Sequence, residues 1–195
     1  MSEQVNAERR RPGRKALKSE KDWLEAALVL LADGGIEAVR VEPLAQSLGV
    51  TKGSFYKRYD SRDDLLVSML DYWRRESTLK VIELLSGIEE PSEAKLARVL
   101  EISGRRPDAG ERARMEMAIR LWGHSDRRAA ATMEEVDALR LKYFRSVVLE
   151  NGFDGAEAEA RAFLIYALGV LEAVIPGERS PEMMEACRAI VAGKA

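Results

Sequence analysis

The sequence predicts an all-α fold. Along most of the 195 residues, apolar side chains recur every three or four positions, which is the spacing of a helix that buries one face. Proline and glycine gather between these stretches, and the sequence contains no convincing alternation of apolar and polar residues that would indicate a strand. We therefore expect helices joined by short connections, in one domain or two small ones.

The first helix is expected over residues 21–32, because Trp23 and Ala27 fall on one face. The glycines at positions 34 and 35 end it. Further along the chain, Ser86-Gly87 with Pro91 and then Asn151-Gly152 end two long helices. The helices expected after the first are two short ones within residues 41–60 and those over residues 62–85, 92–102, 111–123, 126–150, 156–175 and 181–192.

Residues 41–62, VEPLAQSLGVTKGSFYKRYDSR, have the sequence form of a helix-turn-helix, a motif that places its second helix in the major groove of DNA. Gly49 lies where the first helix must stop, since glycine tolerates the left-handed backbone common at such ends. Thr51 is a favourable N-cap for the second helix, expected over residues 51–59. An ordinary helical hairpin with a solvated basic face is the alternative interpretation.

Basic charge is concentrated in the N-terminal part of a chain whose overall net charge is −2. Residues 1–18 hold six lysines and arginines against two glutamates, and residues 51–62 hold four against one aspartate. This asymmetry favours a DNA-reading part joined to a part that does not bind DNA. We expect residues 1–18 to form a flexible basic arm that contacts DNA, or else a disordered solubilising terminus. The arm residues in this prediction are Arg9, Arg10, Arg11, Arg14 and Lys15.

The segment VRVEPLAQSLGVTKGSFYKRYDSRDDLL resembles the DNA-binding signature of the TetR (tetracycline-repressor-type) transcriptional regulators. The resemblance is strongest from Trp23 to Leu70, and looser similarity in EMAIRLWGHSD and LENGFDG extends it over the chain. Members often have His-Phe where this chain has Arg58-Tyr59, and commonly Lys at Arg62. The changes keep an aromatic or cationic character, so DNA binding is still expected.

The resemblance implies a three-helix helix-turn-helix DNA-binding domain over residues 19–64, with its motif at about 41–60, and a C-terminal helical domain over residues 65–195 for ligand sensing and dimerisation. Lysine and arginine neutralise phosphates, while serine and tyrosine hydroxyls donate hydrogen bonds to DNA. The residues expected to contact DNA are Arg40, Thr51, Lys52, Gly53, Ser54, Tyr56, Lys57, Tyr59 and Arg62.

A second copy of the chain is the expected partner of the C-terminal domain. Residues 162–171, AFLIYALGVL, are apolar on every side of a helix, so one face can meet the core and the other a second subunit. The family resemblance implies a four-helix bundle between subunits, whereas a monomer with a central buried helix is the alternative. The expected interface residues are Val136, Tyr143, Phe144, Val147, Phe163, Tyr166 and Val170.

The resemblance also implies a small-molecule effector in a pocket among the central helices. Flexible methionine and flat tryptophan suit an apolar or aromatic ligand, and we expect it to bind near Trp73 and Trp122 and to weaken DNA binding. Residues of this kind at helical spacing also form ordinary core. The expected pocket residues are Met69, Trp73, Met115, Met117, Ile119 and Trp122.

Catalysis, metals and cofactors are not expected. His124 and Cys187 are the only histidine and cysteine, they fall on different expected elements, and no phosphate-binding or zinc-binding spacing is present. The polar start of the chain and the single cysteine favour a cytoplasmic protein. The longest apolar run has ten residues, fewer than the roughly 20 needed to span a bilayer, so no membrane partner is expected.

The sequence therefore predicts a homodimeric, sequence-specific transcriptional regulator that binds a near-palindromic double-stranded operator. A repressor released by a small molecule is expected first. A DNA-binding protein without ligand sensing and an activator of the same fold are the alternatives.

Overall fold

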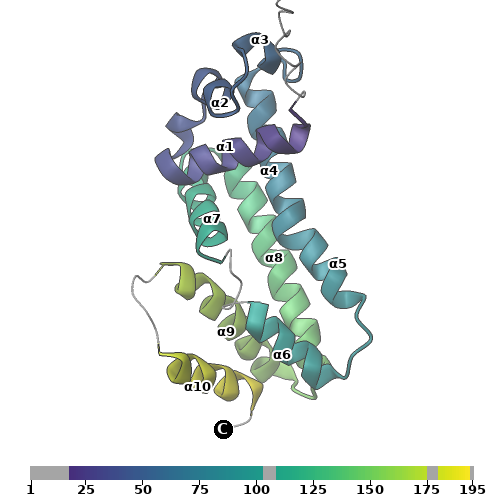
Figure 1. The fold of residues 1–195 in the computed structure, drawn as a ribbon. Helices are drawn as coiled ribbons and strands as arrows, with labels where there is room; N and C mark the ends of the chain where they lie inside the picture. The colour runs from purple at the N-terminus through teal and green to yellow at the C-terminus, as the bar shows by residue number, and fades with distance from the viewer. Residues whose placement is uncertain (1–17, 103–108, 175–179, 194–195) are drawn as a thin grey trace, which may run out of the picture.

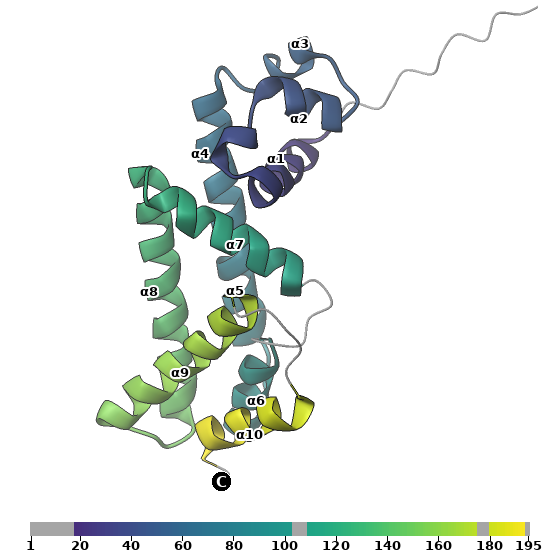
Figure 2. The ribbon, with the colours of Figure 1, turned by 90° about the vertical axis from the view of Figure 1, so that its left-hand side faces the viewer.

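The structure, a computed structural model, describes residues 18–102, 109–174 and 180–193. These residues form helices and connecting turns without a β-strand, as the all-α prediction expects. The molecule is elongated (Figure 1). The short helices α2 (Val41–Ser47) and α3 (Lys52–Phe55) lie at one end, and α6 (Ser92–Ile102) and α10 (Pro181–Ala192) lie at the other. Figure 2 shows the same separation in a second view.

The first helix, α1 (Glu20–Gly34), precedes the predicted helix-turn-helix and begins with a capping box. The Ser19 hydroxyl accepts from the Asp22 amide at 3.2 Å, and the Asp22 carboxylate accepts from the Ser19 amide at 2.7 Å. A single 3₁₀ turn, η1 (Ile36–Ala38), leads to α2 (Val41–Ser47). Gly49 then turns the chain at φ 65°, in the left-handed region, as its predicted role requires.

The second helix of the predicted helix-turn-helix is shorter than the expected span of residues 51–59. The α-helix α3 covers Lys52–Phe55, and residues 56–58 continue as turns. The Phe55 carbonyl accepts from the amides of both Arg58 and Tyr59, at 2.8 and 3.0 Å, which tightens the chain after one helical turn. Thr51 occupies the N-cap position, but its side chain makes no capping hydrogen bond.

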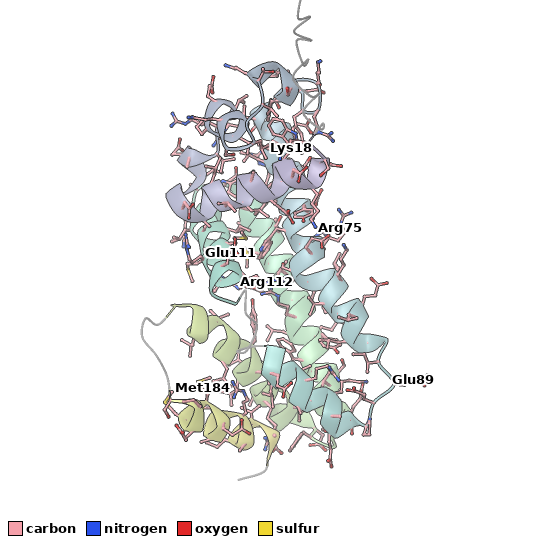
Figure 3. The ribbon with its side chains drawn as sticks, viewed as in Figure 1. Lys18, Arg75, Glu89, Glu111, Arg112 and Met184 are labelled. Atoms are coloured by element: carbon pink, nitrogen blue, oxygen red, sulfur yellow. The ribbon has the colours of Figure 1, made fainter. Side chains whose placement is uncertain are left out.

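The expected helix over residues 62–85 contains an interruption. Helix α4 (Arg62–Arg74) passes through a π-helical turn, η2 (Arg75–Leu79), into α5 (Lys80–Ser86), and Figure 3 labels Arg75 at the start of that turn. Thr78 of this turn is 1% exposed and accepts a hydrogen bond from Arg140 Nε at 3.1 Å. The wider turn thus accompanies a buried hydroxyl that pairs with a half-buried cation.

The C-terminal helices agree closely with the expected spans. They are α6 (Ser92–Ile102), α7 (Ala109–Gly123), α8 (Arg127–Glu150), α9 (Gly155–Val174) and α10 (Pro181–Ala192). Helix α8 runs lengthwise beside α4 and α5 in Figure 1. No helix in the described ranges is long and apolar enough to cross a membrane.

Two apolar cores hold the molecule together. The first joins helices α1 to α4 to α7 and α8, and therefore crosses the predicted domain boundary between residues 64 and 65. Trp73, Trp122 and Val136 all belong to this core together with Trp23 of α1. The second core lies among α5, α6, α8, α9 and α10. The two predicted domains therefore share one packed core.

Candidate DNA-binding surface

The helix-turn-helix packs its apolar side chains inward around Phe55. Phe55 and Leu44 are both 0% exposed, and the Phe55 ring meets the edge of Trp23 at a centroid distance of 5.8 Å. A backbone hydrogen bond of 2.9 Å from Val50 to Ala45 closes the turn between α2 and α3. This packing fixes the angle between the two helices and leaves the other face of α3 at the end of the molecule (Figure 1).

Residues 51–57, which comprise α3 with its N-cap and the turn after it, present polar and cationic groups in one short stretch. Lys52, Gly53 and Lys57 are exposed, and Tyr56 is 53% exposed with its ring set edge-on against Phe55. Ser54 is half-buried and its hydroxyl lies 3.1 Å from that of Thr51. Lys57 forms no hydrogen bond or ion pair with any described residue. These groups match what a phosphate backbone and base edges require.

Lys52 has an intramolecular partner that the sequence analysis did not identify. Its ammonium group forms an ion pair with Glu42 of α2, and both side chains are largely exposed, at 54% and 65%. The hydrogen bond between them lowers the pKa of Glu42 and raises that of Lys52. The sequence does mark Glu42 as unusual, because it is the only acidic residue between Arg40 and Arg58.

The N-terminal arm begins next to this surface. Arg58, which the predicted contact set omits, donates from Nη2 to the Lys18 carbonyl at 3.1 Å. Figure 3 labels Lys18 at the same end of the molecule as α2 and α3. The arm residues predicted to contact DNA lie outside the described residues; they are Arg9, Arg10, Arg11, Arg14 and Lys15.

Two predicted contact residues face inward, and a third stays on the surface. Tyr59 is 3% exposed and packs between Phe55 and Trp23, so its side chain belongs to the core, where burial raises its pKa to about 12. Arg62 donates to the backbone carbonyls of Val39 and Ile36 at 2.6 and 2.7 Å, which fastens α4 to the η1 turn. Arg40, at the N-cap of α2, remains exposed.

The residues expected to line an effector pocket lie mainly in packed core. Met69, Trp73, Ile119 and Trp122 are at most 5% exposed and belong to the first core. Met115 packs against this core, and Met117 is half-buried. These apolar side chains therefore pack helices α1 to α4 against α7 and α8. Of the six, Trp73 stands out because it also borders a buried ionic network.

That network joins the middle of η2, α7, α8 and α9. Arg140 donates to Glu116 at 2.7 Å, and its guanidinium lies 5.9 Å from the ring centroids of both Trp73 and Tyr166. Arg120 binds Asp137 in a fork at 2.8 and 3.0 Å and also donates to Glu116 at 2.9 Å. Two cations and two carboxylates are thus neutralised together, half-buried, beside aromatic rings.

Tyr166 belongs to this network, although it was predicted at the dimer interface. It accepts from Arg120 Nη2 at 2.5 Å and donates to Asp137. Burial and the hydrogen bond to Asp137 raise its pKa to about 12. Val136 and Val147 were also predicted at the interface, but each is 0% exposed within a core of its own subunit. An apolar repeat predicts that a helix face is buried but does not say by what. Here other helices of the same chain bury it.

An apolar surface remains on α9. Phe163, Leu164 and Leu171 are 62%, 45% and 46% exposed, and all three lie on this helix. Val170 of the same helix is half-buried. Tyr143 and Phe144 of α8, also predicted at the interface, are half-buried and pack against the second core. The exposed part of the predicted interface is therefore centred on Phe163.

Comparisons with known proteins agree with this arrangement. Residues 24–69 match the sequence profile of bacterial regulatory proteins of the tetR family. Over 77 residues the chain is 30% identical to the uncharacterized HTH-type transcriptional regulator YuxN of Bacillus subtilis, a match that spans 40% of this chain and 26% of that protein.

Solved structures resemble the fold over most of its length. A transcriptional regulator from Rhodococcus sp. Rha1 has a TM-score of 0.64 at 20% identity, over 90% of this chain and 95% of that one. A TetR transcription regulator from Haloarcula marismortui has a TM-score of 0.66 at 19% identity, with the same coverage. A regulator structure from Saccharomonospora viridis, solved in complex with choline, has a TM-score of 0.68 at 17% identity over 89% of this chain and 93% of that one.

Proposed function

We propose that this chain is a sequence-specific DNA-binding transcriptional regulator of the tetR family, whose profile matches residues 24–69. The observation that carries the proposal is the exposed face of residues 52–57, which comprise α3 and the turn after it. This face presents Lys52, Tyr56 and Lys57 inside the segment that matches the family. The packed side of the same motif, around Phe55, holds this face rigidly at one end of the molecule. Rigid presentation is what a helix needs to enter the major groove in a fixed register.

A homodimer is proposed as the DNA-binding form. One short recognition helix reaches only a few base pairs, whereas two related by a two-fold axis read a near-palindromic operator. The exposed apolar surface of α9 around Phe163 supports this assembly, because such surface is normally covered by a partner. Lys57 contacts phosphate in this proposal, and Ser54 and Tyr56 approach base edges.

Repression relieved by a small molecule is the proposed mode of regulation. The operator-bound dimer blocks transcription, and an effector bound in the C-terminal part changes the distance between the two recognition helices. The first core supports such coupling, because it joins α7 and α8 directly to α1 and α4. Ion pairs cross the same junction: Arg128 lies 3.3 Å from Asp63, and Arg114 pairs with Asp33 of α1.

The effector is proposed to carry a polar or charged group. Trp73 adjoins the network of Glu116, Arg120, Asp137 and Arg140, so a ligand near this tryptophan meets charges as well as rings. The S. viridis structure, which has a similar fold, contains choline, a small cation, and this supports the proposal of a small charged ligand. This modifies the apolar ligand that the methionine and tryptophan content predicts.

Binding to the DNA that flanks the protein's own gene tests the proposed function. Fluorescence anisotropy is measured over a salt series, with unrelated DNA as competitor. Tight binding that unrelated DNA does not displace is expected, since base contacts add to the phosphate contacts. The same measurement is made with sequences selected from a random pool. If the protein binds neither the flanking DNA nor the selected sequences more tightly than unrelated DNA, sequence-specific recognition is refuted.

Ligand screening tests the regulatory part separately. Trp73 lies beside Arg140, so a ligand that rearranges this network should change tryptophan fluorescence and weaken operator binding together. Phenylalanine in place of Trp73 should remove the fluorescence change of an active compound. If charged and apolar compound libraries alike leave both signals unchanged, the chain binds DNA without an effector.

A further inference from the structure

We infer that Glu42 and Lys52 act together as a base-reading pair that recognises one C·G base pair in each operator half-site. Glu42 accepts a hydrogen bond from the cytosine N4 amino group, and Lys52 donates to the guanine O6 and N7 acceptors. The inference rests on the proposed function and assigns a specificity role to a residue of α2, outside the recognition helix.

Glu42 has an unusual position for an acidic side chain. Between Arg40 and Arg58 every other charged residue is basic, so a carboxylate here opposes binding to a polyanion. It makes no contribution to the core, because its side chain is 65% exposed. An ion pair between two exposed groups adds little to folding stability, so stability does not explain its presence. Its remaining environment is the surface that faces DNA.

The partner of Glu42 sets its location on that surface. Lys52 is the first residue of α3, and residues at the beginning of a recognition helix are those that reach base edges. Its ammonium group holds the carboxylate at this point through an ion pair across the turn. Each group keeps unused capacity: the carboxylate has further lone pairs, and the ammonium has two further N–H donors.

The two groups match the major-groove edge of a C·G pair. Cytosine presents an N4 donor, and guanine presents two neighbouring acceptors, O6 and N7. A T·A pair fits less well, because the adenine N6 amino group lies beside N7 and repels the ammonium, while the thymine methyl group faces the carboxylate. Glu42 and Lys52 can therefore bind C·G without giving up their mutual ion pair.

Operator variants test the inference. Starting from an operator selected with the wild-type protein, each base pair of both half-sites is replaced in turn by the other three, and binding is measured by competition. Wild-type protein should prefer C·G at one position per half-site by roughly 5- to 150-fold. Glu42→Gln should shift that preference toward A·T, because a glutamine amide pairs with adenine N6 and N7. Lys52→Ala should reduce discrimination at the same position.

Glu93→Gln is the matched control. Glu93 is exposed on α6, at the opposite end of the molecule, and its substitution removes the same charge. It should leave every base preference unchanged. If Glu42→Gln instead tightens binding to all variants by one common factor, Glu42 only restrains Lys52 and the inference is wrong. A wild-type protein that selects no operator would contradict the proposed function itself, which distinguishes the two failures.

Discussion

Individual residues of the predicted helix-turn-helix divide into those exposed on its surface and those that hold the motif together. The predicted contact residues from Arg40 to Arg62 all lie within residues 24–69, which match the family profile. The motif pattern did not distinguish Tyr59 and Arg62 from the exposed residues, because the partners of both lie far away in sequence. Tyr59 packs on Trp23, and Arg62 binds carbonyls more than 20 residues earlier. Such contacts depend on tertiary packing, which a local pattern does not encode.

Lys57 tests the assignment of phosphate contacts. Lys57→Ala should weaken binding to all DNA sequences and lower the slope of log affinity against log salt by about one unit, because one counterion fewer is released. Fluorescence anisotropy over a salt series measures both quantities. Lys142→Ala, an exposed lysine of α8, is the control and should leave the slope unchanged. An unaltered slope in Lys57→Ala would remove Lys57 from the phosphate contacts.

Arg62 tests the internal role that its hydrogen bonds indicate. Arg62→Met keeps most of the aliphatic side chain but removes the donors to the Val39 and Ile36 carbonyls. The free energy of unfolding should fall by about 1–3 kcal/mol, because partly buried acceptors lose their partner. Thermal and urea denaturation without DNA measure this loss. Unchanged stability, accompanied by weaker DNA binding, would instead assign Arg62 to phosphate contact.

At the scale of helices, the sequence predicted most boundaries because caps and breakers are local. Ser92, Gly152 and Pro181 begin or end helices where the pattern places them. The π-helical turn at Arg75–Leu79 was missed, since a wider turn leaves the composition of a helix unchanged. Within this turn, Thr78 contacts Arg140, which lies 62 residues later in the chain.

Asp126 offers a pH test of one helix start. Its carboxylate caps α8 and binds Arg128, and the hydrogen bond from the Arg128 side chain, with that from the Arg128 amide, lowers its pKa from 3.8 to about 2. The folded pKa lies below the unfolded one, so its stabilisation is complete above about pH 4 and is lost as pH falls toward 2.

Asn can keep the cap but removes the charge, so Asp126→Asn isolates this effect. Urea denaturation at pH 6 should show the variant less stable by on the order of 1 kcal/mol, and the difference should shrink as the pH approaches 2. A difference that stays constant over this range would show that the carboxylate charge contributes nothing.

At the scale of the whole molecule, apolar periodicity marks which helix faces are covered but not what covers them. Val136, Val147 and Phe163 fit the same pattern, yet the two valines are buried inside the subunit and the phenylalanine is 62% exposed. The same limit applies to Trp73 and Trp122, which the composition assigned to a ligand pocket and the structure places in packed core. Both distinctions require the arrangement of helices in space.

The dimer prediction follows from the exposed part of that pattern. Phe163→Lys should weaken dimerisation by about 2 kcal/mol or more, because it places a charge at the centre of the apolar surface of α9. Sedimentation equilibrium measures the dissociation constant. Leu84→Lys, on the exposed side of α5, is the control and should remain dimeric. Equal behaviour of the two variants would place the interface elsewhere.

Selection from a random DNA pool with the wild-type protein tests the central claim most directly. A dimer that presents two α3 helices should enrich one motif made of two inverted half-sites, centred about one helical turn apart or a multiple of that distance. The enriched DNA should bind about 10³-fold or more tightly than random DNA at physiological salt. A pool without an enriched motif, or one whose affinity depends on salt alone, would contradict sequence-specific regulation by this surface.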